Sequence, residues 1–476
     1  MGEYYLRLEA VNLANFVYDT SDLSTMRGGS QFVAVAGTVV ENAVTGLEAI
    51  STGASAVLWS FDAVSDDAAK AVRKVAEKAL RDDSDLMHAT FVVDTVPANG
   101  GFRHVSESAL ALNRHRQMVA PSIAVPKTSS NWVCQLDGVR PAVREIKKGK
   151  EKKWVSESVS RRREFGKLER HQVVRLAAKR IELDVRESKE FFDIAGNAPK
   201  GVGNLDGKMA VLFLDGNDFG ALQREKCNIR EQQREYDLAL KEASKRILDS
   251  LLLEAKRNPC QWVNGEVLRL EVLMLAGDEI RIVVPAWCGW IALQRIFETV
   301  EELPKVLGKK LTWKAGLLFC QHHAPIRRML GLADLLAGFA KDNSGSGPAP
   351  NVMAYRVLES FDVPGSTGPK FLRQELAKAE LVLQGDDLEE IAALVQFVRK
   401  RFPRNKLHRI VELHSNAKAD EAEIVIKKEL GELSDEDQNR IVDRRVLVGK
   451  TGWLHFLELA DYALESPSGE GEVTHA

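Results

Sequence analysis

The pattern of hydrophobic and polar positions divides the chain into two similar runs of strands and helices. In the first run, short apolar segments alternate with stretches that carry apolar residues at helical spacing. The expected elements are a strand at 4–11, a helix at 29–44, a strand at 54–63, a helix at 66–80 and a strand at 88–96. This order is βαββαβ or a close variant, which predicts a small sheet with helices on one face, the ferredoxin-like arrangement.

The second run repeats this pattern with stronger signals. It contains a strand, turn and helix at 208–222, a helix at 235–258, two strands around a tight turn at 269–285, a helix at 290–307, a strand at 311–320 and a helix at 324–342. The sequence therefore predicts a second βαββαβ unit followed by one more helix.

The rest of the chain is a basic stretch between the two runs and a helical region after them. Helices are expected at 371–383, 387–402, 421–433 and 453–464, enough for a small bundle. The predicted fold class is α+β, with two tandem ferredoxin-like domains, a basic helical and irregular connector, and an all-α bundle at the C-terminus. The expected divisions are 1–96, 97–203, 204–365 and 366–465, with a disordered tail at 466–476.

Composition narrows the class of protein without fixing its function. The 66 Lys and Arg residues nearly balance the 68 Asp and Glu residues, which excludes a protein that is basic throughout. Five cysteines without C-x-x-C spacing argue against a disulfide framework. The sequence shows neither a signal peptide nor an apolar run of the ~18 residues that a membrane helix needs. We therefore expect a reduced, cytoplasmic protein that does not contact membranes.

The connector contains a strong local excess of positive charge. Residues 144–170 hold eleven Lys or Arg against five Glu, including three consecutive arginines at 161–163. One interpretation is a solvated linker and helix face. The other is a surface that contacts the phosphates of a nucleic acid such as RNA.

The strongest candidate chemistry is a set of carboxylates in the second run. Asp215 ends a buried strand, and Gly277, Asp278 and Glu279 form or follow the tight turn of a hairpin. In a βαββαβ sheet the first strand and the central hairpin are neighbours, so these carboxylates can meet around divalent cations, which prefer oxygen ligands. Gly277 keeps the turn small enough for a nucleotide to approach the backbone. The alternative is an ordinary hairpin with a polar tip.

These residues carry a resemblance to a known family. The segment AGDEI at 276–280 resembles the GGDEF/GGDD hairpin of the nucleotide-cyclase and polymerase palm superfamily. The second run resembles the second palm of the large subunit of type III CRISPR effector complexes. The matching segments are LDGNDFGAL at 214–222, KAGLLFCQHHAPI at 314–326, the helix end at Ala340 and Lys341, and VNLANFVYDTSDLSTMRGGSQFV at 11–33.

The sequence also departs from this family. Ala276 replaces the first glycine of the hairpin, and Glu279 replaces an aspartate. The zinc-binding insert of the family is represented at best by 131–138, which has one cysteine, Cys134, so no structural zinc is expected. The HD nuclease domain of many relatives is expected to be absent, because a palm-like strand begins at Tyr4.

The resemblance implies an enzyme that converts ATP into cyclic oligoadenylates in antiviral defence. It implies that Asp215, Asp278 and Glu279 hold two Mg²⁺ or Mn²⁺ ions. The nucleotide would contact Ala276 and Gly277 at the hairpin, and Lys341 as a phosphate partner. The backbone of Gly216, Asn217, Asp218 and Phe219 would bind phosphate oxygens. A second nucleotide would lie against the first, degenerate palm at Gly28, Gly29 and Ser30.

Several alternatives stay open at this point. Lys341 can simply complement a helix dipole, and Arg27 to Ser30 can be a plain turn. His322 and His323 are expected to be surface residues or to line a nucleotide pocket. The chain can also be a catalytically idle scaffold or RNA-binding subunit, or an enzyme that uses GTP in the manner of diguanylate cyclases. Expected partners are ATP, RNA and other effector-complex subunits, with a homo-oligomer also possible.

Overall fold

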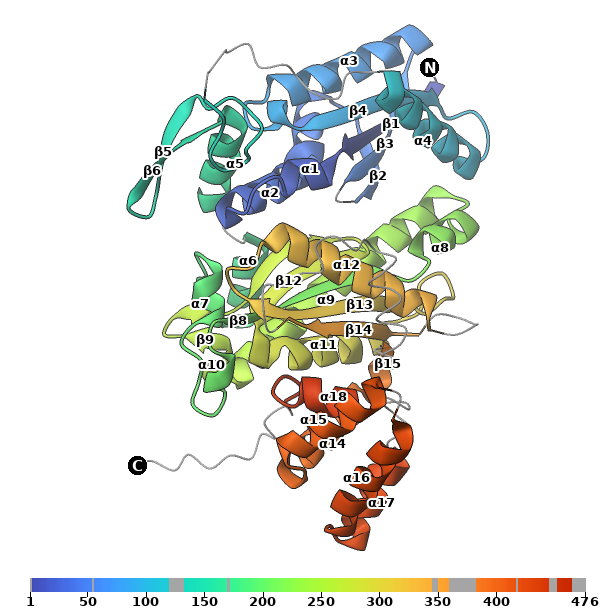
Figure 1. Ribbon diagram of the computed structural model, residues 1–476. Helices are drawn as coiled ribbons and strands as arrows, with labels where there is room; N and C mark the ends of the chain where they lie inside the picture. The colour runs from blue at the N-terminus through green and yellow to red at the C-terminus, as the bar shows by residue number, and fades with distance from the viewer. Residues whose placement is uncertain are drawn as a thin grey trace.

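A computed structural model describes residues 2–53, 55–119, 132–168, 172–344, 350–358, 382–416, 418–444 and 452–464. Figure 1 shows these residues in three tiers, with one sheet domain above a second, larger one and a group of helices below. The fold is α+β with two ferredoxin-like units, as the sequence predicts.

The first sheet is antiparallel and has four strands. They are β1 (Gly2–Val11), β2 (Glu48–Thr52), β3 (Ala56–Ala63) and β4 (Thr90–Pro97). Their spatial order, β2-β3-β1-β4, is the ferredoxin-like order. The sequence pattern does not reveal β2, because this short edge strand has a single buried residue and so shows no clear alternation.

Helices cover both faces of this sheet, so the prediction of helices on one face alone is wrong. The helical elements of the first domain are α1 (Leu13–Val17), α2 (Leu23–Ala43), α3 (Asp66–Asp82), η1 (Leu86–His88) and α4 (Phe102–Val119). The helices α2 and α3 pack on the face that carries Leu6 and Leu8. On the opposite face, Phe102 and Val105 of α4 pack with Tyr5. The stretch expected as a connector thus begins with a helix that completes the first unit.

The second sheet has six strands and repeats the first at its centre. They are β8 (Lys208–Gly216), β11 (Glu271–Ala276), β12 (Glu279–Pro285), β13 (Trp313–Gln321), β14 (Val352–Val357) and β15 (Val382–Gln384). In the spatial order β11-β12-β8-β13-β14-β15, the first four are equivalent to β2-β3-β1-β4. The helices of this unit are α8 (Phe219–Lys226), α9 (Arg230–Arg257), α10 (Pro259–Trp262), α11 (Ala286–Glu301) and α12 (Ile326–Asp342).

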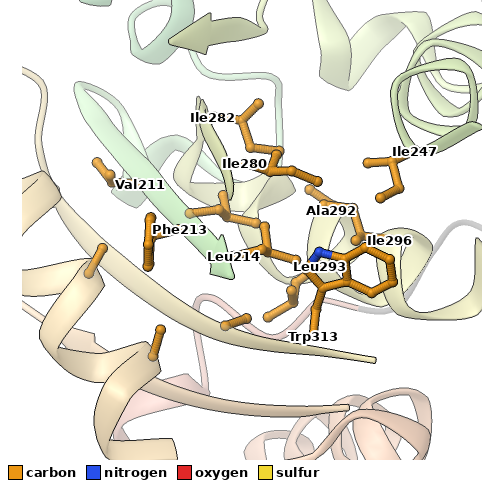
Figure 2. Close-up of a cluster of buried hydrophobic side chains, with 14 of the residues drawn as sticks. Val211, Phe213, Leu214, Ile247, Ile280, Ile282, Ala292, Leu293, Ile296 and Trp313 are labelled. Carbon is orange, nitrogen blue, oxygen red and sulfur yellow. The ribbon is translucent and has the colours of Figure 1, made fainter. Parts of the chain in front are cut away.

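The core of the second unit lies between its sheet and the helices α9 and α11. Figure 2 shows Leu214 and Ile280 of the sheet directed toward Leu293 and Ile296 of α11, and all four are fully or almost fully buried. Val211 and Phe213 lie on the opposite side of β8, where α12 packs. Because side chains alternate along a strand, Asp215 shares the α12 face with Phe213.

The basic connector consists of the hairpin β5 (Arg144–Lys148) and β6 (Glu151–Val155), followed by α5 (Glu157–Leu168), α6 (Gln172–Arg180) and α7 (Phe191–Ala195). The helix α5 packs against α2 of the first unit, whereas α6 packs against α9, and α7 against β8 and β12, of the second unit. A small sheet joins β7 (Arg186–Glu187), β10 (Val267–Leu268) and β9 (Val263–Asn264). Two of the three consecutive arginines are buried: Arg162 binds Asp19, and Arg163 binds Asp22. The charges of these two arginines are therefore used inside the protein.

The last tier is helical, as expected. It contains the short helix η3 (Gly385–Asp387), then α14 (Leu388–Arg401), α15 (Arg404–Ser415), α16 (Ala419–Gly431), α17 (Asp435–Arg444) and α18 (Gly452–Leu459). The helix expected at 371–383 falls mostly outside the described residues, and its last two residues belong to β15. The expected tail at 466–476 lies outside them too. Among the helices in the described ranges, none has both the length and the apolar composition to cross a bilayer.

Candidate active site

The first candidate residue, Asp215, is held at the end of β8 by a cationic neighbour. Strands β8 and β13 are antiparallel, and their register places Lys314 directly opposite Asp215. The Lys314 Nζ atom lies 2.5 Å from Asp215 Oδ2. The two side chains are 14% and 25% exposed. An ammonium group therefore already neutralises the carboxylate that was expected to bind metal.

The hairpin between β11 and β12 is fixed by its backbone and open at its tip. Gly277 has a φ of +62°, the left-handed conformation that glycine adopts without strain. No atom lies within 4 Å of the place where a Cβ would stand at Gly277. The carbonyl of Asp278 accepts hydrogen bonds from the Gly216 N–H at 3.1 Å and from Trp313 Nε1–H at 3.2 Å. A ligand can thus approach the turn, and these hydrogen bonds hold the turn in a fixed position relative to β8.

Glu279 is also paired with a protein cation. Its Oε2 atom lies 3.3 Å from Nη2 of Arg281, two residues along the same face of β12. The Arg281 guanidinium lies over the rings of Phe213 and, from the first domain, Tyr18. This stack places the first domain directly above the carboxylates of the second.

The negative charges in this region act on one another. Burial and the charge of Asp215 raise the pKa of Asp278, against an opposing backbone hydrogen bond and the nearby charge of Lys314. Burial also raises the pKa of Glu279, and the charge of Arg281 opposes this rise. The negative charges of Asp215, Asp278 and Asp334 raise the Glu279 pKa further. Asp334, on α12, has a raised pKa for similar reasons. The site thus contains four carboxylates, one more than the sequence suggested.

The expected metal ligands do not converge in this structure. Within the described ranges, no group of three or more His, Cys, Asp and Glu side chains is close enough to hold a metal ion. Lys314 and Arg281 pair with two of the three expected ligands, Asp215 and Glu279. The binding of two ions by Asp215, Asp278 and Glu279 stays a prediction. The oxygen donors suit Mg²⁺ or Mn²⁺, but not in their present pairing.

The turn after β8 is held in place mainly by structural contacts. The Asn217 N–H donates to the Thr312 carbonyl at 2.8 Å, and its side chain donates to Thr312 Oγ1 and to the Pro350 carbonyl. The ring of Phe219 is buried against Trp313. Gly216 is required because a Cβ there would meet the Phe219 ring at 2.5 Å. Of this segment, only Asp218 presents an exposed side chain, and it precedes the first turn of α8.

Lys341 lies next to this turn. Its Nζ atom is 2.7 Å from Asp218 Oδ1, and the two side chains are 34% and 63% exposed. The structure therefore brings Lys341, from the end of α12, to the N-terminus of α8, as a phosphate-binding role requires. That role stays a prediction.

The glycines of the first unit are explained by packing. Gly28 and Gly29 lie inside α2, where α5 crosses closely. A Cβ at Gly28 would stand 1.8 Å from the carbonyl oxygen of Arg162, and one at Gly29 would stand 3.3 Å from Val17. Ser30 is half-buried on the same helix. The segment is a helix rather than a turn, and its contact with a nucleotide stays a prediction.

The paired histidines lie far from the carboxylates. His322 follows the opposite end of β13, about 26 Å from Lys314 at ~3.3 Å per residue. Its Nδ1 atom is 2.9 Å from the carbonyl oxygen of Gly207, and its ring also contacts Phe192. This contact anchors the end of β13, so His322 does not line the candidate site.

Sequence reasoning missed three charged residues of the site. Lys314 is identifiable only once the register of β13 against β8 is known. Arg281 lies on the same strand face as Glu279, which strand alternation could have indicated. Asp334 had the clearest signal, because it is an acid within the apolar run Leu332 to Leu336.

The comparisons with known proteins identify the fold. No protein-family model and no curated protein matches the chain. Solved structures match it along nearly its whole length, at low identity. The Csm1–Csm4 cassette in complex with pppApApA is 14% identical, with a TM-score of 0.54, over 97% of this chain and 69% of that chain. Csm1 in T. onnurineus is 12% identical, with a TM-score of 0.57, over 98% of this chain and 70% of that chain.

A third match names the assembly. The Csm1–Csm4 subcomplex in the type III-A CRISPR–Csm interference complex is 13% identical, with a TM-score of 0.53, over 97% of this chain and 70% of that chain. The resemblance drawn from the hairpin and its flanking segments is thereby confirmed at the level of the fold: the chain has the fold of these Csm1 structures.

Proposed function

We propose that this chain is a subunit of a type III CRISPR-like effector assembly and that its second palm converts ATP into a cyclic oligonucleotide. The observation that carries the proposal is the position of four carboxylates beside an open glycine turn, at the end of β8 and beneath the first palm. The fold adds support, since similar structures hold one ATP, AMPPNP or cA4.

The residues around the carboxylates suit a triphosphate. Lys341 supplies a point charge beside α8, whose first N–H groups have no partner within the helix. A phosphate group would replace Asp218 as the partner of Lys341. The open tip at Gly277 lets the sugar or the α-phosphate approach the carboxylates without a steric clash.

The carboxylates would then position the reacting hydroxyl and phosphate. A divalent ion would be held by Asp278 and Glu279, with Asp215 as a further ligand once it leaves Lys314, and it would supply charge neutralisation for the displaced pyrophosphate. Asp278 is partly buried near the negative charge of Asp215, which raises its pKa and would also favour a cation bound there.

The assembly would involve further subunits, and the connector is the candidate contact for RNA. The hairpin of β5 and β6 presents Lys147, Lys150 and Lys152 as exposed side chains. Trp154 is 48% exposed on the same hairpin and could stack on a base. The alternative function, an idle scaffold that binds RNA, would use the same surface without any chemistry at Asp278.

The test is to incubate the purified chain with labelled ATP or GTP and Mg²⁺ or Mn²⁺, with and without RNA and companion subunits. We expect pyrophosphate release and a cyclic adenylate product. Both should be lost in Asp278→Ala and retained in Asp67→Ala, whose side chain is 91% exposed on α3. Absence of product in every condition, with the fold intact, would favour the scaffold function. A product formed only from GTP would favour a diguanylate-cyclase-like reaction.

A further inference from the structure

We propose that Lys314 is a resident cation that takes the place of one divalent ion in the second palm, so that the resting site binds one such ion rather than two. The inference concerns the charge and geometry around Asp215, and it rests on the proposed function only for its catalytic meaning.

The position of Lys314 is set by the sheet and not by chance contact at the surface. Residues 314 and 215 are directly paired across two central strands, so their side chains emerge on the same face. The resulting ion pair is 2.5 Å long and mostly withdrawn from water. The neighbouring pair of Lys341 and Asp218 is much more exposed, and surface pairs of that kind contribute little to stability.

The charge of Lys314 reaches more than its direct partner. It also opposes the rise in the pKa values of Asp278 and Asp334 that burial causes, and it adds to the lowering of the Asp218 pKa by Lys341. One ammonium group thus acts on the carboxylates of β8, of the hairpin tip and of α12.

The overall charge of the set supports a single ion. The carboxylates of Asp215, Asp278, Glu279 and Asp334 are opposed by the side chains of Lys314 and Arg281. The excess is two negative charges, which one divalent ion balances. A second ion would bring an excess of positive charge unless nucleotide phosphates entered with it or Lys314 left.

Removal of Lys314 should therefore strengthen metal binding. The Lys314→Met substitution keeps most of the side-chain volume and leaves an excess of three negative charges. Because Asp215 becomes available as a ligand, the variant should bind Mn²⁺ at least about tenfold more tightly than the unmodified chain, or should bind a second Mn²⁺ ion per chain. The gain should disappear in the double variant Lys314→Met with Asp215→Asn.

The experiment is a titration of the full chain with Mn²⁺ alone, read by electron paramagnetic resonance of free Mn²⁺ and by calorimetry. Lys341→Met is the matched control, since it removes an exposed lysine that pairs with Asp218, and it should change the affinity by less than about twofold. Thermal unfolding checks each variant, and Lys314→Gln replaces Lys314→Met if the latter fails to fold.

Unchanged Mn²⁺ affinity and stoichiometry in the folded Lys314 variant would overturn the proposal, as would two equivalents bound by the unmodified chain. The readout requires no turnover. If the chain makes no cyclic product but the Lys314 variant gains Mn²⁺, the proposed function fails and the assignment of Lys314 stands.

Discussion

The two palms share one fold, but the carboxylate at the end of the first strand has different ion-pair partners in each palm. In the first palm, Glu9 on β1 accepts from Arg7 at 2.7 Å and from Arg114 at 3.0 Å. In the second palm, Asp215 on β8 has one lysine partner, at 2.5 Å. The first hairpin, between β2 and β3, carries no acid at Thr52, Gly53, Ser55 or Ala56, whereas the second carries Asp278 and Glu279.

This difference decides which palm can attract a cation. At Glu9, two guanidinium groups face one carboxylate, so no negative charge remains for a metal ion or for a metal–nucleotide complex. Around Asp215, carboxylates outnumber cationic side chains; burial, together with these nearby negative charges, raises the pKa values of Asp278 and Glu279. The fold supplies two equivalent positions, and the local charge makes only one of them a candidate for catalysis.

The first palm instead holds the acidic hairpin of the second palm in place through a buried ion pair. Arg27 on α2 donates from Nε to Oε1 of Glu271 at 2.7 Å, and its Nη2 group donates to Glu271 Oε2 and to the Ser188 carbonyl. The side chains of Arg27 and Glu271 are 2% and 0% exposed. Glu271 begins β11, the strand that leads to the acidic hairpin. The first palm thereby fixes the base of the hairpin on which the second palm depends.

The largest expected effect on stability comes from breaking this contact. Arg27→Met leaves the Glu271 carboxylate buried without the Arg27 guanidinium, which should lower the free energy of unfolding by roughly 3–5 kcal/mol. Denaturant unfolding measures this loss. Arg27→Met combined with Glu271→Leu should recover a large part of it. If the single variant lost less than about 1 kcal/mol, the two palms would not be coupled through this pair.

A smaller effect should follow from Gly28→Ala. A methyl group there meets the backbone of Arg162, which cannot rotate away, so α2 and α5 must separate at a cost of about 1–3 kcal/mol. The matched control is Gly331→Ala on α12, where nothing lies within 4 Å and alanine should stabilise the helix by roughly 0.5–1 kcal/mol. Thermal unfolding compares the two. Loss of ATP binding in Gly28→Ala without loss of stability would instead indicate a nucleotide contact.

The smallest expected effects are pH-dependent changes in stability. Removing a carboxylate should lower the melting temperature in the first palm and raise it in the second. Burial tends to raise the pKa of Asp22, but hydrogen bonding to Thr25 and the charges of Arg163 and Lys148 lower it below 3.8. Asp22 therefore stabilises the fold above about pH 4, and this stability is lost as the pH falls through its lowered pKa. Asp22→Asn should lower the melting temperature at pH 7.

Asp278 should behave in the opposite way. Its pKa is raised above 3.8, so the folded state binds the proton more tightly than the unfolded state, and stability falls as the pH rises through that pKa. Asp278→Asn should raise the melting temperature at pH 7 by a few degrees, with the gain vanishing near pH 4. Melting curves from pH 4 to pH 8 test both variants. If both substitutions shifted the melting temperature at pH 7 in the same direction, the two palms would not differ as described.

The sequence predicted the architecture well because the periodicity was strong in both copies. The order of β8, α9, β11, β12, α11 and β13 follows from apolar spacing, and Gly277 marks the hairpin turn. The positive stretch was harder to interpret, because a lysine or arginine count does not distinguish exposed groups from buried ones. Arg162 and Arg163 pair with Asp19 and Asp22, which are more than 140 residues away in the sequence.

The candidate site was predicted only in part, for a related reason. Asp215 and Asp278 stand in recognisable local patterns, but the state of a carboxylate depends on what the fold places opposite it. Lys314 meets Asp215 through strand register, and Asp334 comes from α12, the helix that follows β13. Neither relation is local in the sequence, so the pairing that prevents a ready metal site could not be read from the motif.

The central claim is that the second palm, and not the first, carries out nucleotide chemistry. The most direct test measures pyrophosphate release from ATP for the unmodified chain, Asp215→Asn and Glu9→Gln under identical conditions, with the companion subunits and RNA present. We expect Asp215→Asn to release pyrophosphate roughly a hundredfold or more slowly than the unmodified chain, and Glu9→Gln to release it at a rate within about threefold of that chain. Equal losses in both variants, or a greater loss in Glu9→Gln, would contradict the account.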